Sequence, residues 1–275
     1  MSDIVDLARV NRVGYRSLQA RRQYAKASGY LDKGEEAALS FVIDHCVTRD
    51  VLDIGVGGGR TIPIMKQFAE NYIGIDYIKE MVNIAAKKFP KECLKVMDAR
   101  ILDFANHSFN LVAFSNNGID SVGFVDRQRI IRLVHAVLRP QGYFVFSALN
   151  YHGRDTTQDV GLRAMLKQLV ASPISALNRK RLKKYTIDTG EESIRNLNAH
   201  FNGLVATFTT IENQIKQLEH FHFVVERVYD VNGGLVKLGD TAVHSPYVHY
   251  VAKKILRPAE IMFWSDNNNM NTNLY

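Results

Sequence analysis

A run of glycines is the first feature of this sequence whose residue types and spacing point to chemistry. Gly55, Gly57 and Gly59 follow a short apolar segment and precede a segment with helical spacing. In that context glycines let the backbone approach a ligand, and the first turn of the helix offers unpaired N–H groups. A dinucleotide fingerprint would need a glycine three residues after Gly57, where this chain has Arg60. The run therefore favours a nucleoside site over a pyrophosphate site.

Three aspartates end successive apolar segments, at Asp53, Asp76 and Asp98. Asp76 lies 21 residues after Gly55, a spacing at which a carboxylate can accept hydrogen bonds from both ribose hydroxyls. Asp98 or the backbone of Ala99 could receive an adenine amino group. Asp53 would repel a phosphate but could orient an ammonium group through the loop. Each aspartate alone could equally cap a helix, but together they favour a nucleoside with a zwitterionic tail.

The elements that must position these residues follow from the hydrophobic pattern. Five short apolar segments alternate with segments of helical spacing, and they are residues 51–54, 72–76, 94–97, 110–115 and 143–149. This alternation predicts βαβ units and a parallel sheet covered on both faces. Two last strands, 221–229 and 247–255, are joined through a turn at 232–234, so one of them should be reversed. The predicted fold class is α/β: a doubly wound, Rossmann-like, seven-stranded sheet, mostly parallel with one reversed strand, plus a helical cap.

We divide the chain into five segments on the same grounds. Residues 1–40 should form an N-terminal helical lid, and residues 41–150 the cofactor-binding Rossmann-like core. Residues 151–209 should form a helical cap insertion. Residues 210–264 should complete the core with a helix and the last two strands. The tail, residues 265–275, is rich in asparagine and is predicted to be disordered.

Composition narrows the class of protein. The chain has 275 residues, of which 46% are hydrophobic and 23% charged, as in globular proteins. Its two cysteines cannot form a disulfide framework, and His-Glu-x-x-His is absent, so we predict no metal site. The N-terminus does not look like a secretory signal, and no apolar stretch approaches the roughly 18 residues that span a bilayer. We expect a cytoplasmic protein without a membrane partner.

The net charge of +7 can steer anionic partners without identifying them. The clearest basic run is Arg179 to Lys184, and it contains no aromatic residue on which a nucleic-acid base could stack. We interpret this run as a solvated helix face and do not expect a nucleic-acid partner.

At this point the chain resembles the class I S-adenosylmethionine-dependent methyltransferases, from Val51 to Asn150 and over the final pair of strands. The matching positions are the glycine-rich first motif at 51–59, the ribose-binding acidic position at 73–76, the adenine position at 96–99, the fourth strand at 109–112 and the turn before the fifth strand at 138–143. Two residues depart from the family pattern. Asn110 stands for the usual aspartate, and Gln141 for the first glycine of the turn.

The resemblance implies that S-adenosylmethionine is the cofactor and S-adenosylhomocysteine its product, after a nucleophile attacks the sulfonium methyl group in line. The residues that we expect to contact the cofactor are Asp53, Gly55, Gly57, Gly59, Asp76, Tyr77, Met81, Asp98, Ala99, Ser115 and Asn116. Because a sulfonium is a strong electrophile, positioning in a dry pocket can supply most of the barrier reduction. A base is needed only for a hydroxyl or a protonated amine.

The loop after the fourth strand, residues 115–121, bears on the methyl acceptor. It lacks the Asn-Pro-Pro-Tyr-like sequence of enzymes that methylate base amino groups or glutamine amides, and it resembles the small-molecule branch of the family. That branch implies methyl transfer to an oxygen or nitrogen atom of a small acceptor enclosed by the lid and the cap. The expected pocket residues are Tyr15, Tyr24, Tyr30, Asn117, Tyr151 and Phe208. The candidate bases are His152, then Asp120 and His200.

Two alternatives stay open. A tRNA or rRNA methyltransferase would use the positive charge, with RNA affinity that falls steeply as salt rises. A nucleotide-fold binding module without transfer activity, or a nicotinamide oxidoreductase, would use the fold alone. The sequence does not identify the acceptor or the oligomeric state, and a homodimer is compatible with it.

Overall fold

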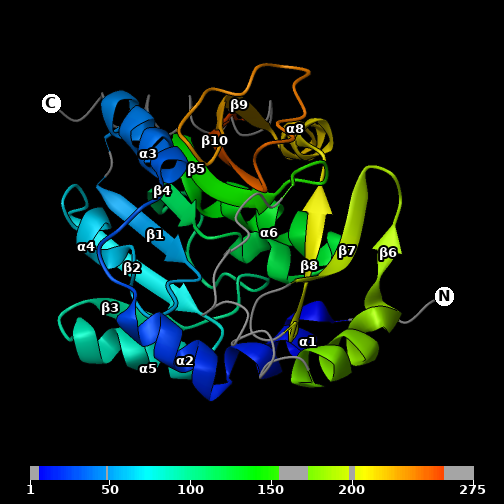
Figure 1. Cartoon of the computed structure of the whole chain (residues 1–275). Coiled ribbons are helices and arrows are strands. Elements are labelled where there is room, and N and C mark those ends of the chain that lie inside the picture. Colours follow the sequence, from blue (N-terminus) through cyan, green and yellow to red (C-terminus); the bar gives the residue numbers. More distant parts are fainter. Residues whose placement is uncertain (1–5, 48, 155–172, 198–201, 257–275) are drawn as a thin grey trace, which may run out of the picture.

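The centre of the computed structural model, which describes residues 6–47, 49–154, 173–197 and 202–256, is a seven-stranded sheet (Figure 1). Its strand order is β3-β2-β1-β4-β5-β10-β9. The strands are β1 (Asp50–Ile54), β2 (Asn71–Asp76), β3 (Cys93–Val96), β4 (Phe109–Phe114), β5 (Leu138–Leu149), β9 (Phe223–Tyr229) and β10 (Tyr247–Lys254). Neighbours among the first five pair in parallel, whereas β10 is antiparallel to β5 and β9. The predicted α/β fold class, with its seven-stranded sheet and one reversed strand, is confirmed.

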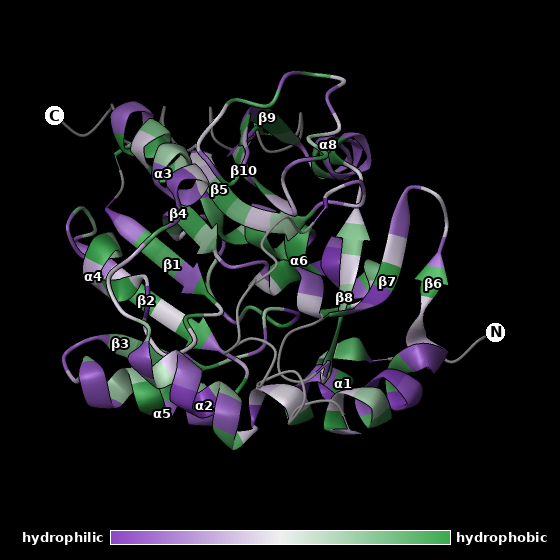
Figure 2. Ribbon diagram, viewed as in Figure 1, coloured by the Kyte–Doolittle hydropathy of each residue, from purple (hydrophilic) through white to green (hydrophobic). Residues whose placement is uncertain are grey.

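Each face of the sheet carries its own hydrophobic core, because successive side chains of a strand point to opposite faces. The first core contains Leu52, Val112, Phe144 and Phe146, with residues of α6 (Phe124–Val137) and α8 (Ile211–His220). The second contains Val51, Leu111, Tyr143 and Val145, with residues of α3 (Lys33–His45), α4 (Ile62–Met65) and α5 (Lys79–Lys88). Figure 2 shows β4 and β5 as largely hydrophobic, whereas β1 has hydrophobic residues between polar ones. The buried apolar residues of these three strands lie on both faces of the sheet.

Two short N-terminal helices, α1 (Leu7–Tyr15) and α2 (Leu18–Lys26), precede α3. The side chains of Asp6 and Ser17 cap them by accepting hydrogen bonds from the backbone N–H groups of Arg9 and Ala20. α2 packs against α5, whereas α3 packs against β9 and β10. The predicted lid boundary at residue 40 therefore falls inside α3, whose buried residues belong to the core layer. Of the predicted lid, α1 and α2 lie outside that layer.

The region predicted as a helical cap, residues 151–209, differs from the prediction. Residues 173–182 are helical, but β6 (Ile187–Asp188), β7 (Glu192–Leu197) and β8 (Leu204–Thr209) form an antiparallel sheet in that order. The β8 sequence, Leu-Val-Ala-Thr-Phe-Thr, combines β-branched residues with burial along nearly its whole length, which favours a strand over a helix. Residues 155–172 and the predicted tail lie outside the described residues. No helix in the described ranges is long and apolar enough to cross a bilayer.

Candidate functional site

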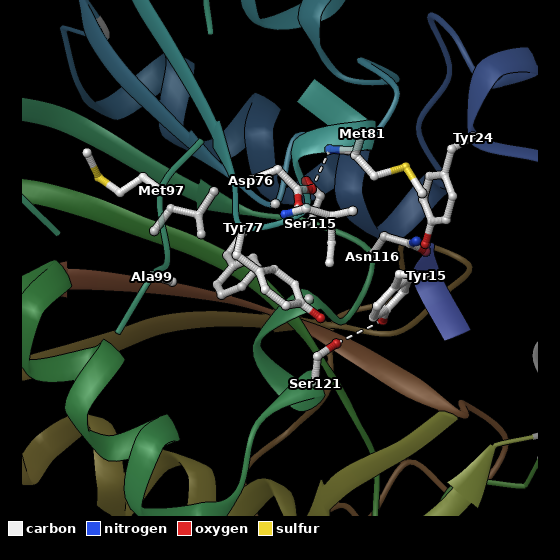
Figure 3. A pocket seen from close by; sticks show the side chains of 16 residues that line it. Tyr15, Tyr24, Asp76, Tyr77, Met81, Met97, Ala99, Ser115, Asn116 and Ser121 are labelled. Carbon is white, nitrogen blue, oxygen red and sulfur yellow. Dashed lines mark hydrogen bonds between the residues drawn. The ribbon is translucent and has the colours of Figure 1, made fainter. Parts of the chain in front are cut away.

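A cavity of about 90 Å³ lies at the carboxyl edge of the parallel strands, under α1 and α2 (Figure 3). Of the predicted site residues, those that line it are Tyr15, Tyr24, Gly55, Gly57, Asp76, Tyr77, Met81, Ala99, Ser115 and Asn116. They come from the ends of four strands and from three helices, so only the folded sheet brings them together. Ligands of doubly wound folds bind at this edge.

Two residues of the glycine run, Gly55 and Gly57, line the cavity. Gly55, Gly57 and Gly59 have φ angles of +70°, +55° and +85°, which residues with a side chain rarely adopt. A Cβ atom on Gly57 would lie 3.2 Å from the ring of Tyr24, and one on Gly58 would lie 2.1 Å from the Tyr24 carbonyl oxygen. The loop therefore presents bare backbone to α2, and it has no room for side chains in these positions.

Asp76, the last residue of β2, lines the cavity. Its carboxylate accepts hydrogen bonds from the backbone N–H groups of Gly57 (3.0 Å) and Ile78 (2.8 Å), one on each oxygen. Burial raises the pKa of Asp76 to about 6, and these two hydrogen bonds oppose that rise. Because each carboxylate oxygen can accept more than one hydrogen bond, the group can still receive two donors from a ligand.

Three tyrosines enclose the cavity. The ring of Tyr15 packs edge to face against Tyr24 and Tyr77, with centroids 6.4 Å and 6.5 Å apart. The hydroxyl groups of Tyr15 and Ser121 are 2.9 Å apart, whereas the buried hydroxyl of Tyr77 has no hydrogen-bond partner among the described residues. Burial raises the pKa of all three phenols, so they stay protonated at neutral pH. They supply apolar walls and neutral hydroxyls, and no base.

A second hollow of about 340 Å³ lies on the other side of Tyr24 and shares Gly55, Gly57, Ser115 and Asn116 with the first. Tyr30, a predicted pocket residue, lines this second hollow together with Arg60. The Arg60 guanidinium binds both carboxylate oxygens of Glu35, at 2.7 and 2.9 Å. Small-molecule sites usually occupy roughly 300–1,000 Å³. The two hollows together have this volume, whereas the first one alone does not.

Three of the predicted cofactor residues lie outside both hollows: Asp53, Gly59 and Asp98. Asp53 is 1% exposed and accepts hydrogen bonds from the hydroxyls of Thr61 (2.5 Å) and Tyr72 (2.8 Å). It therefore fastens the glycine loop to β2. Burial opposes ionisation of Asp98, but its pairing with Arg100 at 2.8 Å lowers its pKa overall. Its neighbours Met97 and Ala99 line the cavity instead.

The structure does not bring the candidate bases to the cavity. Asp120 is 1% exposed, pairs with the buried guanidinium of Arg127 and accepts the backbone N–H of Leu149 at 2.6 Å. It is held as a structural ion pair and does not line the cavity. His152 lines a separate hollow beside β9, and His200 lies outside the described residues.

The other predicted pocket residues also lie elsewhere. The rings of Tyr151 and Phe208 flank the guanidinium of Arg195, 4.5 and 5.0 Å from it, in the insertion. Asn117 adjoins the cavity in sequence but does not line it. Its backbone N–H donates to Ser147 Oγ at 2.8 Å, in a left-handed conformation with φ of +56°. An aromatic residue in the right segment is therefore weak evidence for a pocket position.

Sequence reasoning missed six residues that line the cavity: Ile54, Ile78, Met97, Phe114, Gly118 and Ser121. Ile54, Met97 and Phe114 lie at or next to strand ends, so the predicted strand boundaries could have identified them. Gly118 and Ser121 belong to the loop 115–121, whose place after the fourth strand pointed to the acceptor, but that they begin and end a short 3₁₀ helix, η1 (Gly118–Ser121), was not indicated by any sequence pattern.

Comparisons with known proteins agree with this geometry. Residues 52–146 match the model of a protein family described as a methyltransferase domain. The chain is 35% identical over 102 residues to an uncharacterized protein of Methanocaldococcus jannaschii, covering 37% of this chain and 38% of that protein. It is 26% identical over 152 residues to human EEF1A lysine methyltransferase 2, covering 50% and 64%. The matched stretches thus span less than two thirds of these curated relatives.

Solved structures show the same fold. The CcbJ methyltransferase of Streptomyces caelestis is 17% identical, with a TM-score of 0.57 over 86% of this chain and 96% of that chain. The 1,6-didemethyltoxoflavin-N1-methyltransferase of Burkholderia thailandensis, with S-adenosylhomocysteine bound, is 14% identical, with a TM-score of 0.55 over 90% and 89%. At such identities the likeness concerns the arrangement of the chain and not its acceptor.

Proposed function

Because this chain belongs to the class I S-adenosylmethionine-dependent methyltransferases, we propose that it transfers the cofactor's methyl group to an oxygen or nitrogen atom of a small-molecule acceptor. The observation that carries this proposal is the buried carboxylate of Asp76, which faces a cavity between the bare glycine loop and three neutral phenols. The family assignment favours this function over a nicotinamide oxidoreductase.

The described residues fit an adenosyl group with an amino-acid tail. Asp76 can accept both ribose hydroxyls, and the unpartnered hydroxyl of Tyr77 is a further donor inside the cavity. Met97 and Phe114 offer apolar surface for a flat base. The backbone of Gly57 and the second hollow offer space for the tail.

The chain's own contribution to the reaction would be orientation and exclusion of water. When bound, S-adenosylmethionine supplies an electrophilic methyl group. α1 and α2 cover the cavity, and the Tyr15 and Ser121 hydroxyls can hydrogen-bond an acceptor atom. Positioning two reactants in a dry site accounts for a large share of catalysis in such displacements.

The largely apolar lining of the cavity beneath α1 and α2 supports a small acceptor, and so does the toxoflavin enzyme, which has the same fold and whose structure holds 1,6-didemethyltoxoflavin. A second candidate is a lysine side chain of a protein, which the match to EEF1A lysine methyltransferase 2 favours. The two differ in where the methyl group arrives, so one labelling experiment separates them.

The test uses the purified full chain with S-adenosylmethionine labelled in the methyl group, added to a cell extract that has been divided by size. Label in the small-molecule fraction supports the proposal, and label in the protein fraction supports lysine methylation. Calorimetry first establishes binding of S-adenosylmethionine and S-adenosylhomocysteine, with Asp103→Asn, an exposed aspartate outside the cavity, as control for Asp76→Ala. A folded protein that binds neither compound would overturn the proposal.

A further inference from the structure

Positive charge is concentrated in three segments of the chain. Residues 7–26, which contain α1 and α2, hold six arginines and lysines and no acidic residue. Helix α5 holds three lysines and one glutamate, and residues 173–185 hold five cations and no acid. Together these segments carry a net charge of +13, although the whole chain carries only +7. The rest of the chain therefore has a net charge of −6, and the molecule is strongly polarised.

The fold places these segments side by side. α2 packs against α5, α1 adjoins α2, and Leu7 of α1 shares a buried cluster with Leu182. In Figure 1, α5, α2, α1 and the helix at residues 173–182 lie in a row along the lower side. We call this surface, made of α5, α1, α2 and residues 173–185, the basic face. It is also the outer side of the two helices that cover the cavity.

Most charge on the basic face is available to a partner. Arg21, Arg22 and Lys180 are exposed, and no carboxylate in the described part of the chain lies within ion-pair distance of them. The single acid of the face, Glu80, is paired with Arg16 at 2.6 Å. Since exposed cations gain little from isolated surface pairing, the accumulation of unpaired ones points to an external anion rather than to stability.

Exposed aliphatic side chains lie among these cations. The exposed fractions are 62% for Val13, 57% for Leu18, 54% for Ile174 and 67% for Leu177. Leu18 also lines a groove of about 330 Å³ between α2 and α5, with Arg22 at its rim. Within the described part of the basic face, the large apolar side chains that are mostly exposed are aliphatic and not aromatic.

The combination of exposed cations with exposed aliphatic side chains distinguishes between a nucleic acid and an anionic membrane as partners. Nucleic-acid binding without sequence preference combines cations with aromatic stacking platforms. Helices that lie on membranes combine lysine and arginine with large apolar side chains, leucine among them, and need no stacking platform; each cation strengthens attraction to anionic lipids. We propose that the basic face binds the surface of a membrane that contains anionic lipids. This binding does not depend on the methyltransferase activity.

The proposal departs from the expectation of no membrane partner. That expectation rested on the absence of an apolar stretch long enough to span a bilayer. The one clear run of basic residues, Arg179 to Lys184, was interpreted as a solvated helix face. The basic face is instead assembled from segments that are far apart in the sequence. Attraction to an anionic membrane requires only that their cations and aliphatic side chains share one surface. Only the run Arg179 to Lys184 is evident in the sequence, and it is one part of this surface.

The test is co-sedimentation of the full chain with lipid vesicles, which needs no catalytic turnover. Phosphatidylcholine vesicles should bind little protein. Vesicles of equal parts phosphatidylcholine and phosphatidylglycerol should bind most of it, and less as salt screens the charges. Arg21→Glu with Arg22→Glu should lower the partition coefficient at least about tenfold. The matched control, Arg129→Glu with Arg132→Glu on exposed positions of α6, changes net charge equally but lies outside the basic face.

A second double variant separates lipid from other anions. Leu18→Ser with Leu177→Ser keeps every charge, and it should weaken vesicle binding several-fold while leaving weak binding to single-stranded RNA unchanged. Circular dichroism confirms that each variant is folded. Tighter binding to RNA or polyglutamate than to anionic vesicles would overturn the proposal. So would an equal loss of vesicle binding in the α2 variant and its α6 control.

Discussion

Asp76 and Asp120 lie at the same edge of the sheet but in opposite surroundings. Both are buried, and burial raises the pKa of each to about 6. Asp120 is compensated by the guanidinium of Arg127, which itself is bound to Gln214. Within the described ranges, Asp76 accepts hydrogen bonds from two backbone N–H groups and lines a cavity. A buried carboxylate at a strand end therefore becomes a candidate binding group only where its charge lacks a partner and space remains beside it.

The largest expected effect is a loss of stability when the buried ion pair of Asp120 and Arg127 is broken. Arg127→Met leaves the Asp120 carboxylate buried without its cation, which should lower the free energy of unfolding by about 3–5 kcal/mol. Urea denaturation measures this. Asp76→Asn removes an uncompensated charge and should leave stability equal or higher at pH 7. If Asp76→Asn destabilised the fold as much as Arg127→Met, the contrast between the two aspartates would be lost.

Loss of cofactor binding should follow from a side chain in the glycine loop. Gly57→Val places a branched side chain against Tyr24 in a backbone conformation with φ of +55°. We expect no detectable binding of S-adenosylmethionine by calorimetry in a folded variant. Gly190→Ala is a suitable control, because Gly190 also has positive φ but has open space around it, far along the chain. Retained binding by Gly57→Val would count against the loop as part of the site.

Removal of the uncompensated carboxylate should weaken cofactor binding without unfolding the protein. Asp76→Ala deletes the proposed acceptor of the ribose hydroxyls, and affinity for S-adenosylmethionine should fall by about 1.5–3 kcal/mol, the range for hydrogen bonds to a charged group. Calorimetric titration beside Asp103→Asn measures the difference. Identical titration curves for wild type and Asp76→Ala would assign the carboxylate a purely local role.

The sequence predicts the position of Asp76 but not the different surroundings of Asp76 and Asp120. The alternation of apolar and helical segments predicted β1 to β5, and the position of Asp76 after β2 predicted a carboxylate at the binding edge. The partner of Asp120 was not predictable in the same way, since the ion pair depends on how α6 and α8 pack against β5. Nor did any periodicity indicate that β6, β7 and β8 form a small sheet, because short strands buried on both faces and short helices give similar apolar runs.

The pH dependence of binding should distinguish Asp76 from its neighbour Asp53. Burial raises the pKa of Asp76 to about 6, so its carboxylate is largely protonated below that pH and a poorer acceptor. Affinity for S-adenosylmethionine should therefore rise with pH up to about 6 and level off above it. Because the pKa of Asp76 is higher in the folded than in the unfolded chain, the free energy of unfolding should fall as the pH rises towards about 6.

Burial also raises the pKa of Asp53 to about 6, so either carboxylate could cause the pH dependence of cofactor affinity. Two variants distinguish them. Asp76→Ala should make the affinity independent of pH in this range. Asp53→Asn should keep the pH dependence, since Asp53 bonds Thr61 and Tyr72 outside the cavity. Loss of the dependence in Asp53→Asn alone would transfer the binding role to the loop anchor.

The smallest expected effect compares two phenols of the cavity. The Tyr77 hydroxyl is buried without a partner among the described residues, whereas the Tyr15 hydroxyl lies 2.9 Å from Ser121 Oγ. Tyr77→Phe should leave the free energy of unfolding unchanged or raise it slightly, because it removes an unsatisfied polar group. The same substitution should weaken cofactor binding by about 0.5–1.5 kcal/mol. Tyr15→Phe should instead cost about that much in stability. Calorimetric titration and urea denaturation of both variants would show whether an unsatisfied buried hydroxyl, like the uncompensated carboxylate beside it, is held for a ligand.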